Sequence, residues 1–294
     1  MKDYKKKWGD KKDARWCKEA PGLQQALLHL CPDRTNNEAY LQYQLDITEL
    51  LPYLEKKNAE HPDYKTTVFQ AIIFAAVKMI NERPKLNWYA QGRRFYERDE
   101  ISAGFVARRR FTDHSEEALM FFVPQPDDTL DTLSYKIGGE VHEMRNTEKA
   151  AAGANTAVEV LKKLPRPAYM GIAKAVRFLD FFGMVPGAIS DGDPNFSTLF
   201  LTNLGSVGCP AIYHHLSNYG TNSIMVAVGL IHKAELIDKE GNKQIRDVVD
   251  LGITIDERIG DGFYFARSLK LVNHLCAHPE MLFEPISQPS GMEY

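Results

Sequence analysis

The sequence predicts an α/β fold built as one large domain, and three stretches carry that prediction. Residues 39–47 (AYLQYQLDI) alternate between apolar and polar side chains, as a half-buried strand does. Residues 66–82 (TTVFQAIIFAAVKMINE) are apolar almost all round, which is typical of a central helix, and Pro84 ends it. Residues 251–275 alternate up to Ile255 and change to helical spacing after the Asp261-Gly262 turn, which predicts a strand-to-helix elbow.

Shorter patterns place the other elements. We expect helices over 22–30, 48–58 and 130–149, a tight turn at Gln91-Gly92 between two extended segments, and strands over 101–108, 118–123, 196–205 and 222–230. Residues 172–185 are amphipathic, which favours a helix that is buried or packs between subunits over one that lies on a membrane. For residues 150–194 the sequence indicates no role beyond packing.

Charge is distributed unevenly along the chain. The formal net charge is −3, but Met1–Lys18 holds eight Lys or Arg against three Asp, a net of +5, so the rest carries −3 − 5 = −8. We therefore separate a basic N-terminal arm, residues 1–38, from a domain over 39–294. The arm has few aromatic residues and no amphipathic spacing, which favours a solvated or partner-docking segment over a nucleic-acid-binding one.

Several classes of protein are excluded by missing patterns. Cys17, Cys31, Cys209 and Cys276 show neither CxxC pairing nor zinc spacing, which predicts reduced thiols and no metal site. There is no signal peptide and no apolar run of the ~18 residues that a membrane span requires, so we expect a cytoplasmic protein without a transmembrane segment. The absence of a phosphate loop, a dinucleotide fingerprint, GxSxG and HExxH excludes nucleotide-dependent enzymes and metallohydrolases.

The elbow sequence ITIDERIGDG resembles a motif in which ITIDH is followed by three residues and DG. That motif belongs to the catalytic domain of the acyltransferase subunit of 2-oxo-acid dehydrogenase complexes and, in shorter form, to chloramphenicol acetyltransferase. PKLN before the predicted hairpin, FLTNLG at 200–205 and NSIMVAVGL at 222–230 are similar to further family segments. The resemblance implies a chloramphenicol-acetyltransferase-like sandwich, a mixed sheet with flanking helices, and an acyltransferase-like catalytic domain over 39–294.

The resemblance also implies roles for single residues. In the family the His that opens the motif is the general base, and a Ser hydroxyl of the NLG segment donates to the oxyanion. The motif Asp is structural and pairs with an Arg. The matching positions here are Glu257 for the base, Thr202 for the oxyanion donor and Asp261 for the structural carboxylate, with Arg258, Arg15 or another basic residue as its expected partner. The expected substrate-binding residues are Asn203, Gly262, His214 and His215, and Gly262 is expected to give the turn its backbone freedom.

The chain departs from the family at Glu257. A carboxylate is about 2 pK units less basic than an imidazole, and it adds negative charge where a thiolate must form. Three explanations stay open: burial beside Asp256 and Asp261 makes the carboxylate more basic, His214 or His215 has taken over as base, or catalysis has been lost. Because neighbouring residues on a strand point to opposite faces, we expect at most one of the two histidines to face a site.

Two functions follow from the resemblance. The first is an acyltransferase that moves an acyl group between coenzyme A and an unknown acceptor, and Thr202 favours it. The second is a catalytically inactive trimeric homologue that binds acyl-CoA or acts as a scaffold, and Glu257 favours it. The family forms trimers in which one chain supplies the elbow and its neighbour the oxyanion donor, so we expect a homotrimer with small-molecule acyl donor and acceptor. No segment resembles a lipoyl-bearing hairpin, so we expect no lipoyl group of its own.

Overall fold

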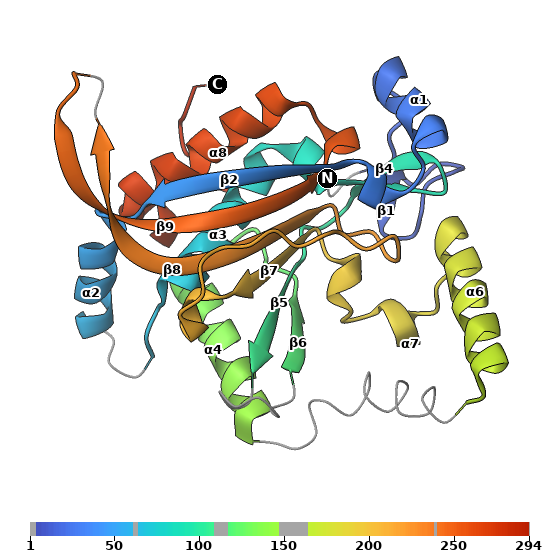
Figure 1. Cartoon of the computed structure of the whole chain (residues 1–294), viewed down its shortest axis with the longest axis horizontal. Coiled ribbons are helices and arrows are strands. Elements are labelled where there is room, and N and C mark those ends of the chain that lie inside the picture. Colours follow the sequence, from blue (N-terminus) through green and yellow to red (C-terminus); the bar gives the residue numbers. More distant parts are fainter. Residues whose placement is uncertain (1–3, 61–63, 109–116, 147–163, 238–239, 294) are drawn as a thin grey trace.

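A six-stranded mixed sheet forms the centre of the computed structural model, which describes residues 4–60, 64–108, 117–146, 164–237 and 240–293 (Figure 1). The large sheet has the order β2-β9-β8-β7-β5-β6, and β1-β4-β3 form a smaller sheet. β7 runs parallel to β5 and β8, whereas the other neighbours in the large sheet are antiparallel. The strands are β1 (Ala14–Trp16), β2 (Glu38–Asp46), β3 (Trp88–Gln91), β4 (Arg94–Arg98), β5 (Ala103–Arg108), β6 (Glu117–Phe122), β7 (Leu199–Asn203), β8 (Ile224–Ile237) and β9 (Lys243–Asp256).

Helices flank this sheet, and the predicted α/β fold is confirmed. α3 and α8 pack against each other, and the apolar core lies between them and strands β7, β8 and β9. Short 3₁₀ turns, η1 (Arg34–Asn36) and η5 (Glu257–Ile259), lie close to the end of β9. The helices are α1 (Gly22–Leu30), α2 (Leu50–Glu60), α3 (Val68–Glu82), α4 (Leu130–Asn146), α6 (Arg166–Phe182), α7 (Gly187–Ser190) and α8 (Gly262–Ala277).

The central helix α3 begins where its sequence provides a cap. The Thr67 hydroxyl accepts a hydrogen bond from the Gln70 backbone N–H, and the Gln70 side chain accepts from the Thr67 N–H, which satisfies two otherwise unpaired donors. The helix predicted over 66–82 therefore starts at Val68. Helix α4 begins at Leu130 as predicted, whereas residues 147–149 of that prediction and the stretch 150–163 lie outside the described residues.

The β8–β9 hairpin is much longer than the two strands predicted at 222–230 and 251–255. Each strand is fourteen residues long, and the two pair in an antiparallel ladder with a register shift between Val228 and Ile231. The prediction stopped early because the outer half of the hairpin is rich in charged residues. Gly241 has a φ of 89°, and the Gly241-Asn242 turn was the signal that could have revealed this half.

Residues 14–37, which the sequence assigned to a basic arm, are built into the fold. β1 pairs with β4, and Arg34 in η1 is only 5% exposed. Its side chain donates to backbone carbonyls of residues 217 and 220. A solvated or partner-docking arm therefore does not describe this segment, because its cationic side chains have partners inside the domain.

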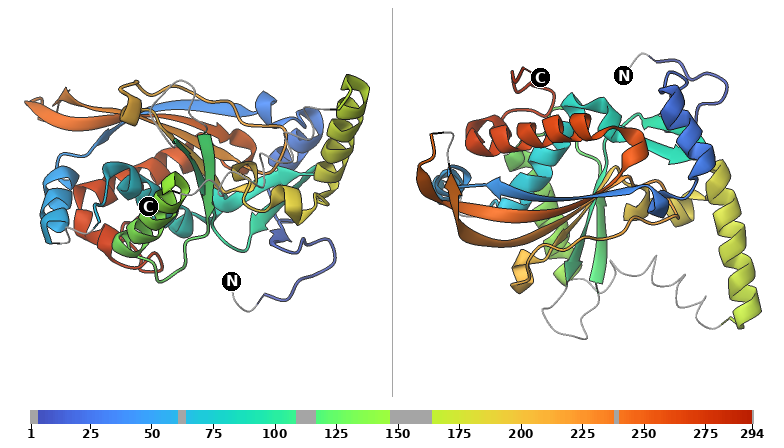
Figure 2. Two further views of the ribbon diagram at one scale, coloured as in Figure 1. Left: turned by 90° about the horizontal axis from the view of Figure 1, so that it is seen from below. Right: turned by 45° about the horizontal axis from the view of Figure 1, so that its top comes forward.

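Helix α6 stands along one side of the molecule, away from α8 (Figure 2). Nearly all of its residues are exposed, including Tyr169, Phe178 and Phe182, while Asp180 is buried. The expectation of a buried helix is thus wrong within one chain; packing between subunits stays a prediction. No helix of the described residues has the length and hydropathy of a bilayer-spanning segment.

A segment without regular structure, residues 208–216, crosses the face of the large sheet opposite α3 and α8. It passes over β8 and β9 at two glycines, so closely that added side chains would collide. A Cβ on Gly229 would lie 2.5 Å from the Ala211 nitrogen, and one on Gly252 would lie 2.1 Å from the Ile212 carbonyl oxygen. The glycines therefore set where this segment lies.

Gly252→Ala is expected to lower the free energy of unfolding by about 3 kcal/mol, the upper end of the cost of overpacking, because backbone has to move. Gly138→Ala is the matched control, since Gly138 lies inside α4 and nothing is within 4 Å of its added Cβ. That variant should gain about 0.5–1 kcal/mol. Urea unfolding measures both, and equal stability of the two variants would contradict the close crossing.

Candidate functional site

The elbow has the predicted strand-to-helix form, but Asp261 has a different role from the one expected. β9 ends at Asp256, η5 follows, and α8 starts at Gly262. Asp261 is exposed, and its carboxylate caps α8 by accepting a hydrogen bond of 2.8 Å from the Tyr264 N–H. The expected pairing of Asp261 with Arg258 or Arg15 is thus wrong for the single chain, because these arginines pair with Asp256 and Glu97. Gly262 is exposed and its φ is not positive, so the turn does not require a glycine there.

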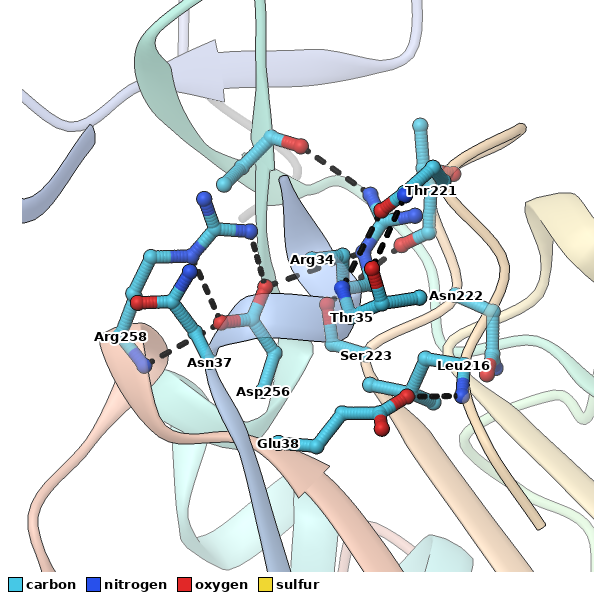
Figure 3. A network of polar contacts seen from close by, with 12 residues as sticks. Arg34, Thr35, Asn37, Glu38, Leu216, Thr221, Asn222, Ser223, Asp256 and Arg258 are labelled. Carbon is cyan, nitrogen blue, oxygen red and sulfur yellow. Dashed lines mark hydrogen bonds and ion pairs between the residues drawn. The ribbon is translucent and has the colours of Figure 1, made fainter. Parts of the chain in front are cut away.

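The buried carboxylate of the elbow is Asp256. Arg258 binds it with two hydrogen bonds, from Nε to Oδ1 at 2.8 Å and from Nη2 to Oδ2 at 2.7 Å (Figure 3). Arg34 Nε lies 3.7 Å from Asp256 Oδ2. The three side chains are 0%, 2% and 5% exposed for Asp256, Arg258 and Arg34. Burial makes such a pair costly to break, because a lost partner leaves an uncompensated charge.

Arg258 also ties the elbow to the chain that precedes β2. Its Nη1 donates to the carbonyl oxygens of Cys31 at 3.2 Å and Pro32 at 2.9 Å. Arg15, the other expected partner of Asp261, instead pairs with Glu97 at 2.5 Å and Glu19 at 3.1 Å. The sequence reasoning missed Asp256 and Arg34 as site residues. A carboxylate followed two residues later by Arg at the end of a buried strand was the available signal.

Glu257 points away from this network. It is exposed, and its backbone N–H donates to the Asn37 carbonyl at 2.8 Å, which fixes the start of η5. The burial that was expected to make its carboxylate more basic is therefore absent in the single chain. Glu257 is a solvent-facing carboxylate at the rim of the elbow.

Thr202 lies far from Glu257 within one chain. Thr202 is in register with Ala227 on β8, and Ala227 with Gly252 on β9, five residues before Glu257. At ~3.3 Å per residue and ~4.8 Å between strands, the two residues are about 19 Å apart. One chain therefore does not bring the expected base and oxyanion donor together.

The face of β7 that carries Thr202 is the one crossed by the 208–216 segment. Leu199 and Leu201 are buried in the core with α3 and α8, so alternation turns Phe200 and Thr202 to the opposite face. Asn203, at the end of β7, accepts a 3.1 Å hydrogen bond from the Ser206 N–H and so shapes the following turn. Thr202 is half-buried, and its hydroxyl has no hydrogen-bond partner among the described residues.

His214 and His215 line one cavity of about 420 Å³ on that same face. Phe200 and Met225 form part of the cavity wall. Thr202 lies two residues beyond Phe200, on the same face of β7. The histidines do not lie on a strand, so the alternation behind the expectation that at most one faces a site does not apply to them. His214 is half-buried and His215 is exposed. The structure thus places the two imidazoles in one cavity, and neither Thr202 nor Glu257 is part of its lining.

The described residues contain no group of three or more His, Cys, Asp or Glu side chains placed to hold a metal ion. All four cysteines are free, and Cys17 and Cys276 are buried. Burial raises the pKa of each of these two thiols to about 12, so neither is suited to act as a thiolate nucleophile.

Asp256→Asn should destabilise the fold by about 3–5 kcal/mol, because Arg258 would stay buried without its countercharge. Asp261→Asn is the control and should leave stability nearly unchanged, since Asn caps helices as well as Asp does. Denaturant unfolding of both variants measures the difference. A larger loss for Asp261→Asn than for Asp256→Asn would return the structural role to Asp261.

Comparisons with known proteins agree with this geometry. Residues 186–284 match the family described as 2-oxoacid dehydrogenases acyltransferase (catalytic domain). No curated protein matches the chain.

Among solved structures, a probable dihydrolipoamide acetyltransferase from Listeria monocytogenes is similar with a TM-score of 0.58 and 18% identity, covering 97% of this chain and 99% of that one. The dihydrolipoamide acetyltransferase of Azotobacter vinelandii gives 0.59 and 17%, covering 88% and 89%. A chloramphenicol acetyltransferase gives 0.50 and 14%, covering 88% and 98%. The resemblance is thus confirmed: the chain has a chloramphenicol-acetyltransferase-like fold, and over residues 186–284 its sequence matches the acyltransferase catalytic domain of 2-oxoacid dehydrogenases.

Proposed function

We propose that the protein is a cytoplasmic acyltransferase that moves an acyl group between coenzyme A and a small-molecule acceptor, with His214 or His215 as general base. The observation that carries the proposal is the cavity that both histidines line on the Thr202 face of the sheet. Glu257 is exposed at the elbow, and a carboxylate is the weaker base for a thiol, amine or hydroxyl. The acyl group and the acceptor stay open, and neither a metal nor a lipoyl group of its own is needed.

The proposed reaction needs one base and one hydrogen-bond donor. The imidazole takes the proton of the acceptor thiol, amine or hydroxyl as that atom attacks the thioester carbonyl. The Thr202 hydroxyl donates to the oxyanion of the tetrahedral intermediate, which then collapses and breaks the carbon–sulfur bond. The imidazolium returns its proton to the departing coenzyme A thiolate. Asn203 lies at the end of β7 and Gly262 at the start of α8, where they would border the bound substrates across a subunit boundary.

Removing the base should lower the rate of acyl transfer by about 10²–10⁴-fold. We expect this loss in either His214→Ala or His215→Ala, and little change in the other variant or in Glu257→Gln. Thr202→Val should lower kcat with little change in KM, because the hydroxyl acts on the transition state. Release of free coenzyme A thiol from a panel of acyl-CoAs measures all four variants. Full activity in both histidine variants, with loss in Glu257→Gln, would assign the base to Glu257.

A second candidate is an inactive acyl-CoA-binding or scaffolding trimer, and the exposed glutamate at the family's base position favours it. Here the wild type would bind acyl-CoA in calorimetry without turning it over. Glu257→His restores the family motif. A turnover rate that rises at least tenfold in this variant alone would support the hypothesis that the wild-type protein is inactive. An active wild type whose rate Glu257→His does not raise supports the proposed histidine base.

We also propose a homotrimer, as the family resemblance implies. Three exposed isoleucines on the β8–β9 hairpin support association: Ile231, Ile237 and Ile245 are 44%, 66% and 65% exposed. The estimated separation of about 19 Å between Glu257 and Thr202 in one chain fits a site completed by a neighbour. Light scattering at micromolar concentration should give three times 33.4 kDa, and a monomer would exclude a shared site.

A further inference from the structure

A second polar cavity, of about 230 Å³, lies between the β3–β4 turn, η1 and the C-terminal part of α6. Its lining holds more positive than negative charge: Arg34, Arg93, Arg177 and Arg258 against Asp33 and Asp180. Asn218 lines both this cavity and the histidine cavity. Its side chain is occupied by two hydrogen bonds with Thr35, at 3.0 and 3.1 Å, and so forms a wall between them.

Buried arginines form the floor of this cavity. Arg258 is neutralised by Asp256, but Arg34 has no such bidentate partner. Arg34 donates through Nη1 to the Ser217 carbonyl and through Nη2 to the carbonyls of Ala90 and Gly220, while its Nε has no hydrogen-bond partner among the described residues. Burial lowers the pKa of Arg34, and the nearby Asp256 carboxylate acts in the opposite direction.

Two exposed arginines, Arg93 and Arg177, form the rim, and neither guanidinium has a hydrogen bond or ion pair within the described part of the chain. Arg93 has a φ of 59° next to Gly92 with 60°, a left-handed conformation that costs a non-glycine residue about 1–2 kcal/mol. A Cβ on Gly92 would lie 2.6 Å from the Phe181 carbonyl oxygen, so α6 rests directly on this turn. Arg177, one turn earlier on α6, is thereby held beside the same opening as Arg93.

The acidic residues of the lining do not neutralise this rim. Asp180 is 6% exposed and its two oxygens are occupied, Oδ1 by the Gln91 side chain at 2.8 Å and Oδ2 by the Gly220 N–H at 3.1 Å. Burial raises the pKa of the Asp180 carboxyl, because it disfavours the charged form of that group. Asp33 is exposed at the edge. The two rim guanidiniums thus face a single exposed carboxylate.

We propose that this cavity binds the phosphate group of a small phosphate monoester. Arg93 and Arg177 would donate to the phosphate oxygens, because the planar guanidinium matches that geometry in charge-assisted pairs. Arg34 and Arg258 supply positive potential from below. The cavity is several times the ~30 Å³ that one water molecule occupies in the liquid, so it accommodates more than solvent. This site is separate from acyl transfer and is tested without any measurement of activity.

Calorimetry and thermal unfolding test the proposal, with inorganic phosphate and glycerol 3-phosphate as probes and sodium chloride keeping the ionic strength constant. We expect saturable binding, a saturable rise in Tm, and a lower Kd for glycerol 3-phosphate. Arg177→Gln and Arg93→Gly should each raise the Kd at least tenfold, since each removes one charge-assisted contact. Lys174→Gln is the matched control, an exposed cation on α6 outside the cavity lining, and should leave the Kd unchanged.

Arg93→Gly should fold at least as well as the wild type, because glycine adopts a positive φ without strain. Should that variant fail to fold, exposed Arg177 alone decides the outcome. No saturable binding, or an unchanged Kd in Arg177→Gln, would overturn the site. Tighter binding of inorganic phosphate than of glycerol 3-phosphate would overturn the assignment to a monoester and leave free phosphate as the ligand.

Discussion

The buried carboxylate of Asp256 and the two arginines around it hold together three segments that are far apart in the sequence. Arg258 connects the end of β9 to the carbonyls of Cys31 and Pro32, and Arg34 connects η1 to the carbonyls of Ser217 and Gly220. The side chains of Asp256, Arg258 and Arg34 are hidden from water, where an unpaired charge is costly. The positions of the elbow, of η1 and of the chain before β8 therefore depend on one another.

This network decides which elbow residues are available for chemistry. Because Asp256 and Arg258 turn inward to each other, Glu257 between them is left facing solvent. The same network anchors residues 217–220, and the glycines under residues 211 and 212 anchor the preceding segment. Between these two anchors the backbone is irregular, which allows His214 and His215 to line one cavity. Two imidazoles are thus placed where regular strand geometry would have separated them.

A change of base chemistry is consistent with this arrangement. A solvated carboxylate is a weak base toward a thiol, and it would repel the thiolate that forms. An imidazole has neither drawback. Two imidazoles, those of His214 and His215, line the cavity on the face of the sheet that carries Thr202. The arginine-lined cavity beyond the Asn218–Thr35 wall draws on the same network for its floor, so a ligand there and the elbow would share Arg34 and Arg258.

The sequence by itself determined the fold class, the central helix, the elbow and the family resemblance, because these depend on local periodicity, capping and short motifs. Thr67 with Gln70 and the ITIDERIGDG stretch are readable without any knowledge of distant residues. Only the tertiary structure decided that Asp256 rather than Asp261 takes the buried ion pair, since burial depends on what packs over a residue. Only the structure showed that His214 and His215 line one cavity and that Arg93 and Arg177 line another, because those arrangements arise where irregular backbone and distant segments meet, and no periodic pattern encodes such meetings.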